Sequence, residues 1–234
     1  QWVTDIRDKA TGEDIYPAVM EIIRKTKPGE FPGGFRFIFE SAKRLGFICS
    51  PADNHVGDYL WFVDDTIAEA CSLKPYPVDM WFGGRMANDW QQIVAKYDSK
   101  EAIKTYVSQR RIGWLSLQIS RYLMTAGQKY HPAVNLMNNG AIPNLTDDII
   151  VELPAVIGPD GPKAVQYGKL PDTVAPYCQL TGSITNIVAD AAATGSKELA
   201  LQALLMDPFV RSVTVAEALL EDMLAYSRQY ETRF

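Results

Sequence analysis

The densest group of chemically active side chains lies in residues 53–59, which read Asp-Asn-His-Val-Gly-Asp-Tyr and follow the apolar run of residues 47–49. Two carboxylates, an imidazole and a phenol fall within this short segment. In a helix, His55 and Tyr59 would lie on one face, and with Asp53 they offer a general base beside a hydrogen-bonding neighbour. The alternative is structural: Asp53 caps the helix, Tyr59 packs and His55 is solvated, because caps are commoner than catalytic sites.

A second polar segment, residues 138–148, reads Asn-Asn-Gly-Ala-Ile-Pro-Asn-Leu-Thr-Asp-Asp. The amides of Asn138 and Asn139 carry both a donor and an acceptor, which suits the recognition of sugar hydroxyls. The same residues are also typical of turns, because asparagine tolerates a positive φ and bonds its own backbone. The sequence favours the turn over the binding site.

Sites for a metal or a dinucleotide are not indicated by the sequence. Cys49, Cys71 and Cys178 are scattered and form no C-x-x-C pair, so neither a zinc site nor a disulfide framework is predicted. No G-x-G-x-x-G motif follows an apolar run, so this chain is not expected to contain a Rossmann domain. Reduced thiols fit a cytoplasmic location.

Composition excludes several classes of protein. The formal net charge of −5 argues against a nucleic-acid partner, which would need a basic surface. The 47% of hydrophobic residues include no run long enough to cross a membrane. The start lacks the pattern of a signal peptide and an initiator Met, as if the chain were cut from a longer one.

Helices are expected at both ends of the chain and antiparallel strands between them. An Asp14 cap with Pro17 in the first turn predicts one helix, and residues 34–45, ended by Gly46, predict another. Strands are expected in the first seven residues and near residues 134–137 and 149–153, followed by a hairpin whose turn is Pro-Asp-Gly and whose second strand spans 163–167. Other expected helices span residues 86–97, 100–110, 114–126, 197–206 and 214–226, the last of them capped by Thr214. The chain is therefore predicted to be a single α+β domain over residues 1–234.

Four parts of the sequence resemble, in order, the C-terminal half of glycoside hydrolase family 4. The segment 53–59 is similar to the acidic-polar-His, Gly-Glu-Tyr signature of the α-glycosidases in that family. The asparagine-glycine segment and the strand after it resemble the family's most distinctive strand-loop-strand. The matching parts are residues 11–17, 53–59, 138–154 and 198–208.

The resemblance implies a fold like the C-terminal domain of lactate dehydrogenase, mostly helical with a small antiparallel sheet. It also implies a redox route to hydrolysis of an α-glycoside. In the family, NAD oxidises the sugar at C3, a divalent metal (typically manganese) polarises that oxygen, and a base removes the C2 proton. The aglycone is then eliminated, water adds and the hydride returns.

The resemblance assigns provisional roles to five residues. Asp53 would be the base or a substrate-orienting acid, and Tyr59 is the rival base. His55 would orient a substrate hydroxyl or Asp53, while Asn138 and Asn139 would line the sugar site. These assignments require the two polar segments to face a common hollow.

The family's dinucleotide fold and its metal ligands belong upstream of Gln1, so no metal ligand is expected in this chain. NAD and Mn²⁺ would be bound mainly by that other half. The chain alone is expected to be inactive, and the full-length form is expected to be a homo-oligomer. Because residues 50–59 hold no basic side chain for a phosphate, we expect an unphosphorylated substrate.

Two other functions are compatible with the sequence. One is the substrate domain of an NAD-dependent 2-hydroxyacid dehydrogenase, for which His55 could carry a proton, although no Arg lies close in sequence. The other is a non-catalytic interaction module that kept the fold.

Overall fold

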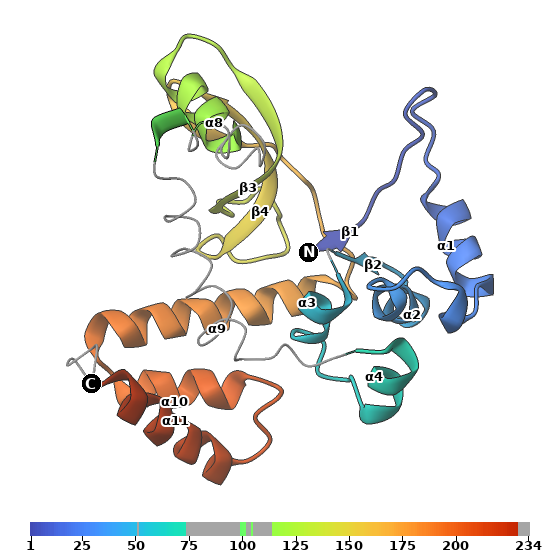
Figure 1. The fold of residues 1–234 in the computed structure, drawn as a ribbon. Helices are drawn as coiled ribbons and strands as arrows, with labels where there is room; N and C mark the ends of the chain where they lie inside the picture. The colour runs from blue at the N-terminus through green and yellow to red at the C-terminus, as the bar shows by residue number, and fades with distance from the viewer. Residues whose placement is uncertain (51, 74–98, 102–103, 105–113, 229–234) are drawn as a thin grey trace.

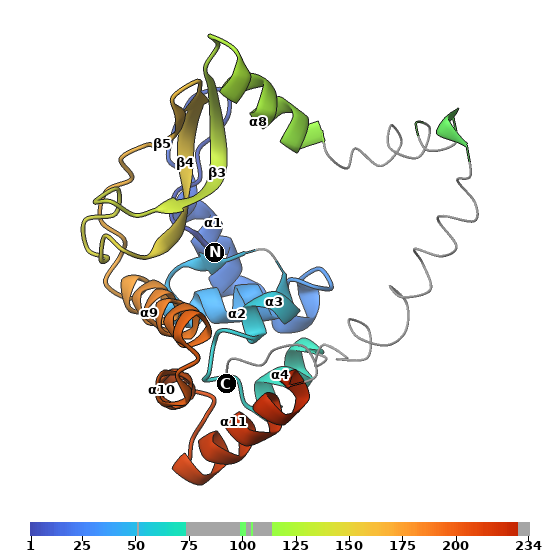
Figure 2. The same ribbon diagram turned by 90° about the vertical axis from the view of Figure 1, so that its left-hand side faces the viewer.

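The computed structural model describes residues 1–50, 52–73, 99–101, 104 and 114–228. Figures 1 and 2 show a small antiparallel sheet of three strands at one end of the molecule, with the long helix α9 (Ala175–Thr194) running below it and most of the other helices beyond. This is the α+β arrangement predicted from the sequence, with helices at both ends of the chain. No helix in the described residues is long and apolar enough to cross a membrane.

The first two helices bury one apolar face each. Helix α1 (Tyr16–Lys25) has Pro17 in its first turn, as expected, but its N-cap residue is Ile15, which makes no side-chain cap bond, and not Asp14. Asp14 accepts a hydrogen bond from the Tyr16 amide at 2.9 Å. Helix α2 (Arg36–Leu45) ends at Gly46, whose φ of 80° lies in the left-handed region that glycine tolerates. Both predicted helices are confirmed.

Only a short part of the first seven residues is a strand, in place of the longer one expected. Strand β1 (Trp2–Val3) pairs antiparallel with β2 (Ile48–Cys49). The hydroxyl of Tyr16 donates to the Val3 carbonyl at 2.9 Å, and the Ile48 amide donates to that hydroxyl at 3.0 Å. One side chain therefore joins α1 to both strands. Between the helices lies a 3₁₀ turn, η1 (Pro28–Glu30).

The three-stranded sheet has the order β3–β4–β5. Strand β3 (Lys129–Met137) starts earlier than predicted, and its pairing with β4 (Ile150–Gly158) shifts register around Pro132. A proline has no amide to donate, so the ladder is interrupted there. Strand β5 (Gly161–Ala164) follows the predicted Pro-Asp-Gly turn but is shorter than expected.

The C-terminal part is helical, as predicted. Helix α9 (Ala175–Thr194) is the longest, and α10 (Lys197–Met206) has the expected bounds. Helix α11 (Val213–Ser227) starts close to the predicted residue, but the predicted cap is wrong. Ser212, not Thr214, accepts the hydrogen bond of the Val215 amide, because the chain is already helical at Thr214.

The described residues in the middle of the chain form two short helices and one longer one. Helices α3 (Asp53–Gly57) and α4 (Asp65–Cys71) lie near α2, and α8 (Trp114–Met124) precedes the sheet. The predicted helix at 114–126 is confirmed. The predicted helices at 86–97 and, for the most part, 100–110 lie outside the described residues.

Candidate functional site

Residues 53–59 form a helical turn whose polar side chains differ sharply in exposure. Helix α3 begins at Asp53, and Tyr59 lies just beyond its end. Tyr59 is 62% exposed and His55 is also exposed, whereas Asp53 is 6% exposed. The phenol and the imidazole are therefore accessible to a ligand, and the carboxylate is not.

The buried carboxylate of Asp53 is used to cap another helix. Its Oδ1 accepts a hydrogen bond from the Ile38 amide, in the first turn of α2, at 3.0 Å. The Asp53 amide in turn donates to the Gly34 carbonyl at 3.0 Å. Phe35, the N-cap residue of α2, makes no side-chain cap bond. Asp53 thus supplies from a distant part of the chain the acceptor that the helix lacks locally.

A second hydrogen bond joins α2 to Ser72, so that residues 53–72 are bonded to this helix at both ends. Arg36 Nη1 donates to the Ser72 hydroxyl at 3.2 Å, and Ser72 ends α4 with a φ of 56°. The Nε of Arg36 is buried and has no hydrogen-bond partner. The sequence analysis missed Arg36, because only the fold brings the start of α2 to residues 53–72.

Apolar anchors fix the underside of this segment. Val56 is 6% exposed and Leu60 2% exposed, and both belong to the core around α1 and α2. Trp61 stacks on Tyr177 of α9 with ring centroids 4.7 Å apart. These contacts bury the apolar side of the turn and leave Tyr59 and His55 exposed.

The asparagine segment is closed on itself. Asn138 is fully buried, and its side-chain amide donates to the carbonyls of Ile142, Leu145 and Thr146 at 3.0–3.1 Å. Its Oδ1 accepts from the Ile142 amide at 2.8 Å. The bonding capacity of Asn138 is therefore used inside the loop, with none left for a sugar hydroxyl.

Two further asparagines in this loop have distinct roles. Asn139 is exposed and has a φ of 43°, which is the turn conformation that the sequence favoured. Asn144 exchanges two hydrogen bonds of 2.9 Å with the backbone of Leu170, and so fixes the chain that leads to α9. Of the two asparagines predicted to line a site, only Asn139 has an accessible side chain.

The two polar segments contact different sides of α9. Trp61 reaches Tyr177, while Gln179 bonds the Thr146 amide at 2.9 Å. Residues two apart in a helix point about 200° away from each other. The two segments therefore lie against different sides of α9, and a common hollow between them stays a prediction.

The described residues contain no cluster of potential metal ligands. Nowhere in that part of the chain do three His, Cys, Asp or Glu side chains come together as metal ligands. The three cysteines are free thiols, and burial raises the pKa of Cys49 to about 12 and also raises the pKa values of Cys71 and Cys178. Protonated thiols are poor ligands and poor nucleophiles. The other histidine, His131, bonds the nearby Ala133 carbonyl at 2.9 Å.

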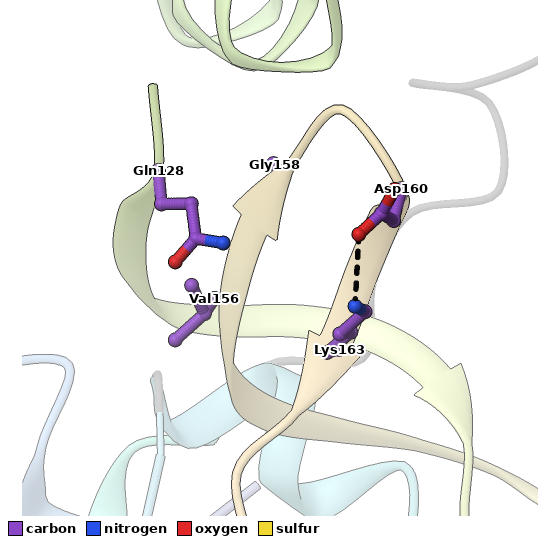
Figure 3. Close-up of a pocket in the computed structure, with 6 residues that line it drawn as sticks. Gln128, Val156, Gly158, Asp160 and Lys163 are labelled. Carbon is purple, nitrogen blue, oxygen red and sulfur yellow. Dashed lines mark hydrogen bonds and ion pairs between the residues drawn. The ribbon is translucent and has the colours of Figure 1, made fainter. Parts of the chain in front are cut away.

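A shallow hollow lies elsewhere, at the β4–β5 hairpin. Figure 3 shows it beside Gln128, Val156 and the ion pair between Asp160 and Lys163, whose atoms are 3.1 Å apart. Its empty volume is about 180 Å³, including space open to solvent. None of the predicted site residues lines it.

Comparison with known proteins defines the class. Residues 1–210 match the C-terminal domain of the family 4 glycosyl hydrolases. The chain belongs to this family. A probable 6-phospho-β-glucosidase of Bacillus subtilis is 40% identical over 101 residues, which cover 43% of this chain and 23% of that protein. A 6-phospho-α-glucosidase of Leptotrichia buccalis is 25% identical over 98% of this chain and 53% of its own length.

A solved structure supports the same conclusion. The 6-phospho-β-glucosidase of Thermotoga maritima, solved with NAD and glucose-6-phosphate, superposes with a TM-score of 0.64 at 25% identity and covers 94% of this chain. The match spans 50% of the Thermotoga chain. The present chain thus spans about half the length of the relatives that it matches throughout.

Proposed function

We propose that this chain is the substrate-side half of a glycosidase that hydrolyses O-glycosyl bonds by NAD-dependent oxidation, elimination and addition. The observation that carries the proposal is the family match over residues 1–210. The relatives are named as glucosidases, which argues against the 2-hydroxyacid dehydrogenase that the sequence left open. A non-catalytic module remains the second outcome of the tests below.

NAD and Mn²⁺ are the proposed cofactors, because a 6-phospho-α-glucosidase from gut microorganisms was solved with both. That protein is 18% identical to this chain, so the likeness shows the fold alone, and its cofactors are carried to this chain only as a proposal. Since the described residues contain no group of three potential metal ligands, and the chain spans about half the length of its relatives, we propose that both cofactors are held mainly by another part of the protein. When bound, they supply the redox and Lewis-acid chemistry.

Tyr59 is the better of the two candidates for the base. Its hydroxyl is exposed, and it sits on a turn fixed from below by Val56 and Leu60. Asp53 would first have to leave its hydrogen bond with the Ile38 amide and the protein interior. We propose that Tyr59 takes the proton and that the exposed His55 orients a sugar hydroxyl beside it. Asn139 is retained as a substrate contact, whereas Asn138 acts only within its loop.

The expected unphosphorylated substrate is not supported by the relatives, most of which are named for phosphorylated sugars. The expectation counted only basic residues near in sequence. In the fold, Arg36 lies at the start of α2, two residues before Ile38, whose amide bonds Asp53. We therefore propose a 6-phosphoglycoside as the first substrate to test. An α-galactosidase of Rhizobium meliloti is also a relative, so an unphosphorylated glycoside is the second.

Activity assays test the proposal directly. The chain alone is expected to give no turnover of 4-nitrophenyl glucoside 6-phosphate, in either anomer, with NAD and Mn²⁺. Joined to, or mixed with, the dinucleotide-binding half of a family relative, it should turn over one of them. Absence of turnover with phosphorylated and unphosphorylated glycosides alike would contradict the proposal. Oxidation of a 2-hydroxy acid without manganese would favour the dehydrogenase.

Location and assembly remain predictions. A cytoplasmic protein that self-associates in its full-length form is still expected. Helix α11 carries exposed apolar side chains at positions where self-association can be tested, namely Val215, Leu219, Met223 and Tyr226. Sedimentation of the full-length form and of a Met223→Lys variant would measure the assembly.

A further inference from the structure

We propose that Asp53 is a positioning residue, which by capping α2 holds the turn that carries His55 and Tyr59, and that it does not exchange a proton with the substrate. The inference rests on the proposed function, but it starts from contacts within this chain. It separates two roles that the sequence could not distinguish, because an aspartate before a helix suits both a cap and a base.

The first argument is the geometry of the cap. The Ile38 amide belongs to the third residue of α2, and this is the amide that an N-cap side chain usually bonds. The helix offers no cap from its own Phe35. A carboxylate at this end of a helix is also favoured by the helix dipole. Asp53 therefore gives α2 both a hydrogen-bond acceptor and a negative charge at its N-terminus, although it lies 15 residues after Ile38 in the sequence.

The second argument is that the segment is held at both ends by the same turn of α2. Asp53 bonds the Ile38 amide at one end, and Ser72 accepts from Arg36 at the other. Arg36 and Ile38 are two residues apart. The segment between these ties includes the exposed Tyr59, so the place of its hydroxyl depends on both bonds.

The third argument is access. A catalytic residue must touch the substrate, and Asp53 is 6% exposed with an oxygen already bonded to the protein. Tyr59, six residues later, is 62% exposed. The two candidates for the base thus divide into a buried group that fixes the turn and an accessible group that the turn presents.

Asparagine and alanine at position 53 distinguish the two roles. Asp53→Asn keeps an acceptor for the Ile38 amide but cannot act as a base, whereas Asp53→Ala removes both functions. In the chain as it stands, hydrogen exchange of the first turn of α2 should be close to wild type in Asp53→Asn and about tenfold faster in Asp53→Ala. Asp64→Ala is the matched control, because Asp64 caps a different helix, α4, by accepting a hydrogen bond from the Ile67 amide at 2.8 Å. Unchanged exchange in Asp53→Ala would overturn the proposal.

The catalytic readout uses the active form defined above. With a positioning role, Asp53→Asn keeps kcat within about tenfold of wild type, while Tyr59→Phe loses about 100-fold or more. If Asp53→Asn loses as much as Tyr59→Phe while α2 stays protected, Asp53 is catalytic and the proposal is wrong. If wild type shows no activity, the proposed function fails, and the exchange data still decide the cap. Should Asp53→Ala not fold, Asp53→Ser, with a shorter side chain and a weaker acceptor, takes its place. Its first turn of α2 should exchange faster than in Asp53→Asn, and exchange as slow as in wild type would overturn the proposal.

Discussion

Residues 53–72 and residues 138–149 look alike in sequence, since each places a polar cluster beside an apolar strand, but they bury opposite groups. In the first segment Asp53, which the sequence offers as a base, is buried against α2, and Tyr59 is left exposed. In the second segment Asn138, which the sequence offers as a contact for a sugar hydroxyl, is buried within its own loop, and Asn139 is left exposed. In each segment, the predicted site residue closer to the apolar strand is used by the fold, and one further along the chain has an exposed side chain.

Removing the buried amide should have the largest effect. Asn138→Ala leaves the Ile142 amide and three carbonyls without their partner, so the free energy of unfolding should fall by about 3 kcal/mol or more. Urea unfolding followed by circular dichroism measures the change. A loss below about 1 kcal/mol would mean that the loop does not depend on this side chain, and the contrast between the two segments would fail.

The contact between the second segment and α9 gives the next effect. A Cβ added at Gly182 would lie 2.9–3.0 Å from atoms of Ile149, which is 1% exposed. Gly182→Ala should therefore destabilise the protein by about 1–2 kcal/mol, even though alanine is the better helix former. Thermal unfolding of this variant, of Ile149→Ala and of the double variant measures the coupling. If the double variant loses the sum of the two single losses, the close approach carries no energy.

Strand β2, which precedes residues 53–72, contains the buried thiol of Cys49, and ionisation of this thiol should destabilise the protein in alkali. Burial raises the pKa of the Cys49 thiol to about 12, so above the ordinary pKa of a thiol the unfolded chain loses this proton first. The free energy of unfolding should then fall by about 1.4 kcal/mol per pH unit between about pH 9 and pH 12. The Cys49→Ala variant should be less stable than wild type at neutral pH, but its free energy of unfolding should fall less between pH 8 and pH 10. Parallel curves for the two proteins would show that Cys49 does not titrate this way.

The smallest effect is expected at the exposed asparagine. Asn139→Gly should change the free energy of unfolding by less than about 0.5 kcal/mol, because glycine accepts the φ of 43°. Asn139→Val should lose about 1–2 kcal/mol, because a branched residue is strained there. Chemical denaturation of both variants tests the turn. In the active form, a raised KM for Asn139→Gly without a loss of stability would identify Asn139 as a substrate contact.

The sequence by itself determined much of the local structure, because caps, glycine stops and apolar spacing act over a few residues. It placed α1, α2, α10 and the hairpin turn close to their observed positions. It failed where two acceptable signals competed: Ser212 precedes Thr214 and captured the cap of α11. The family resemblance was likewise readable from short segments and is confirmed by the match over residues 1–210.

Tertiary structure alone decided which polar side chains are accessible and which groups from distant parts of the chain meet. Asp53 reaches α2, Arg36 reaches Ser72, and Trp61 and Gln179 divide the sides of α9 between them. No spacing in the sequence encodes these pairs. The physical reason is that a buried polar group must find a partner wherever the packing of apolar faces leaves one, and that packing is a property of the whole chain.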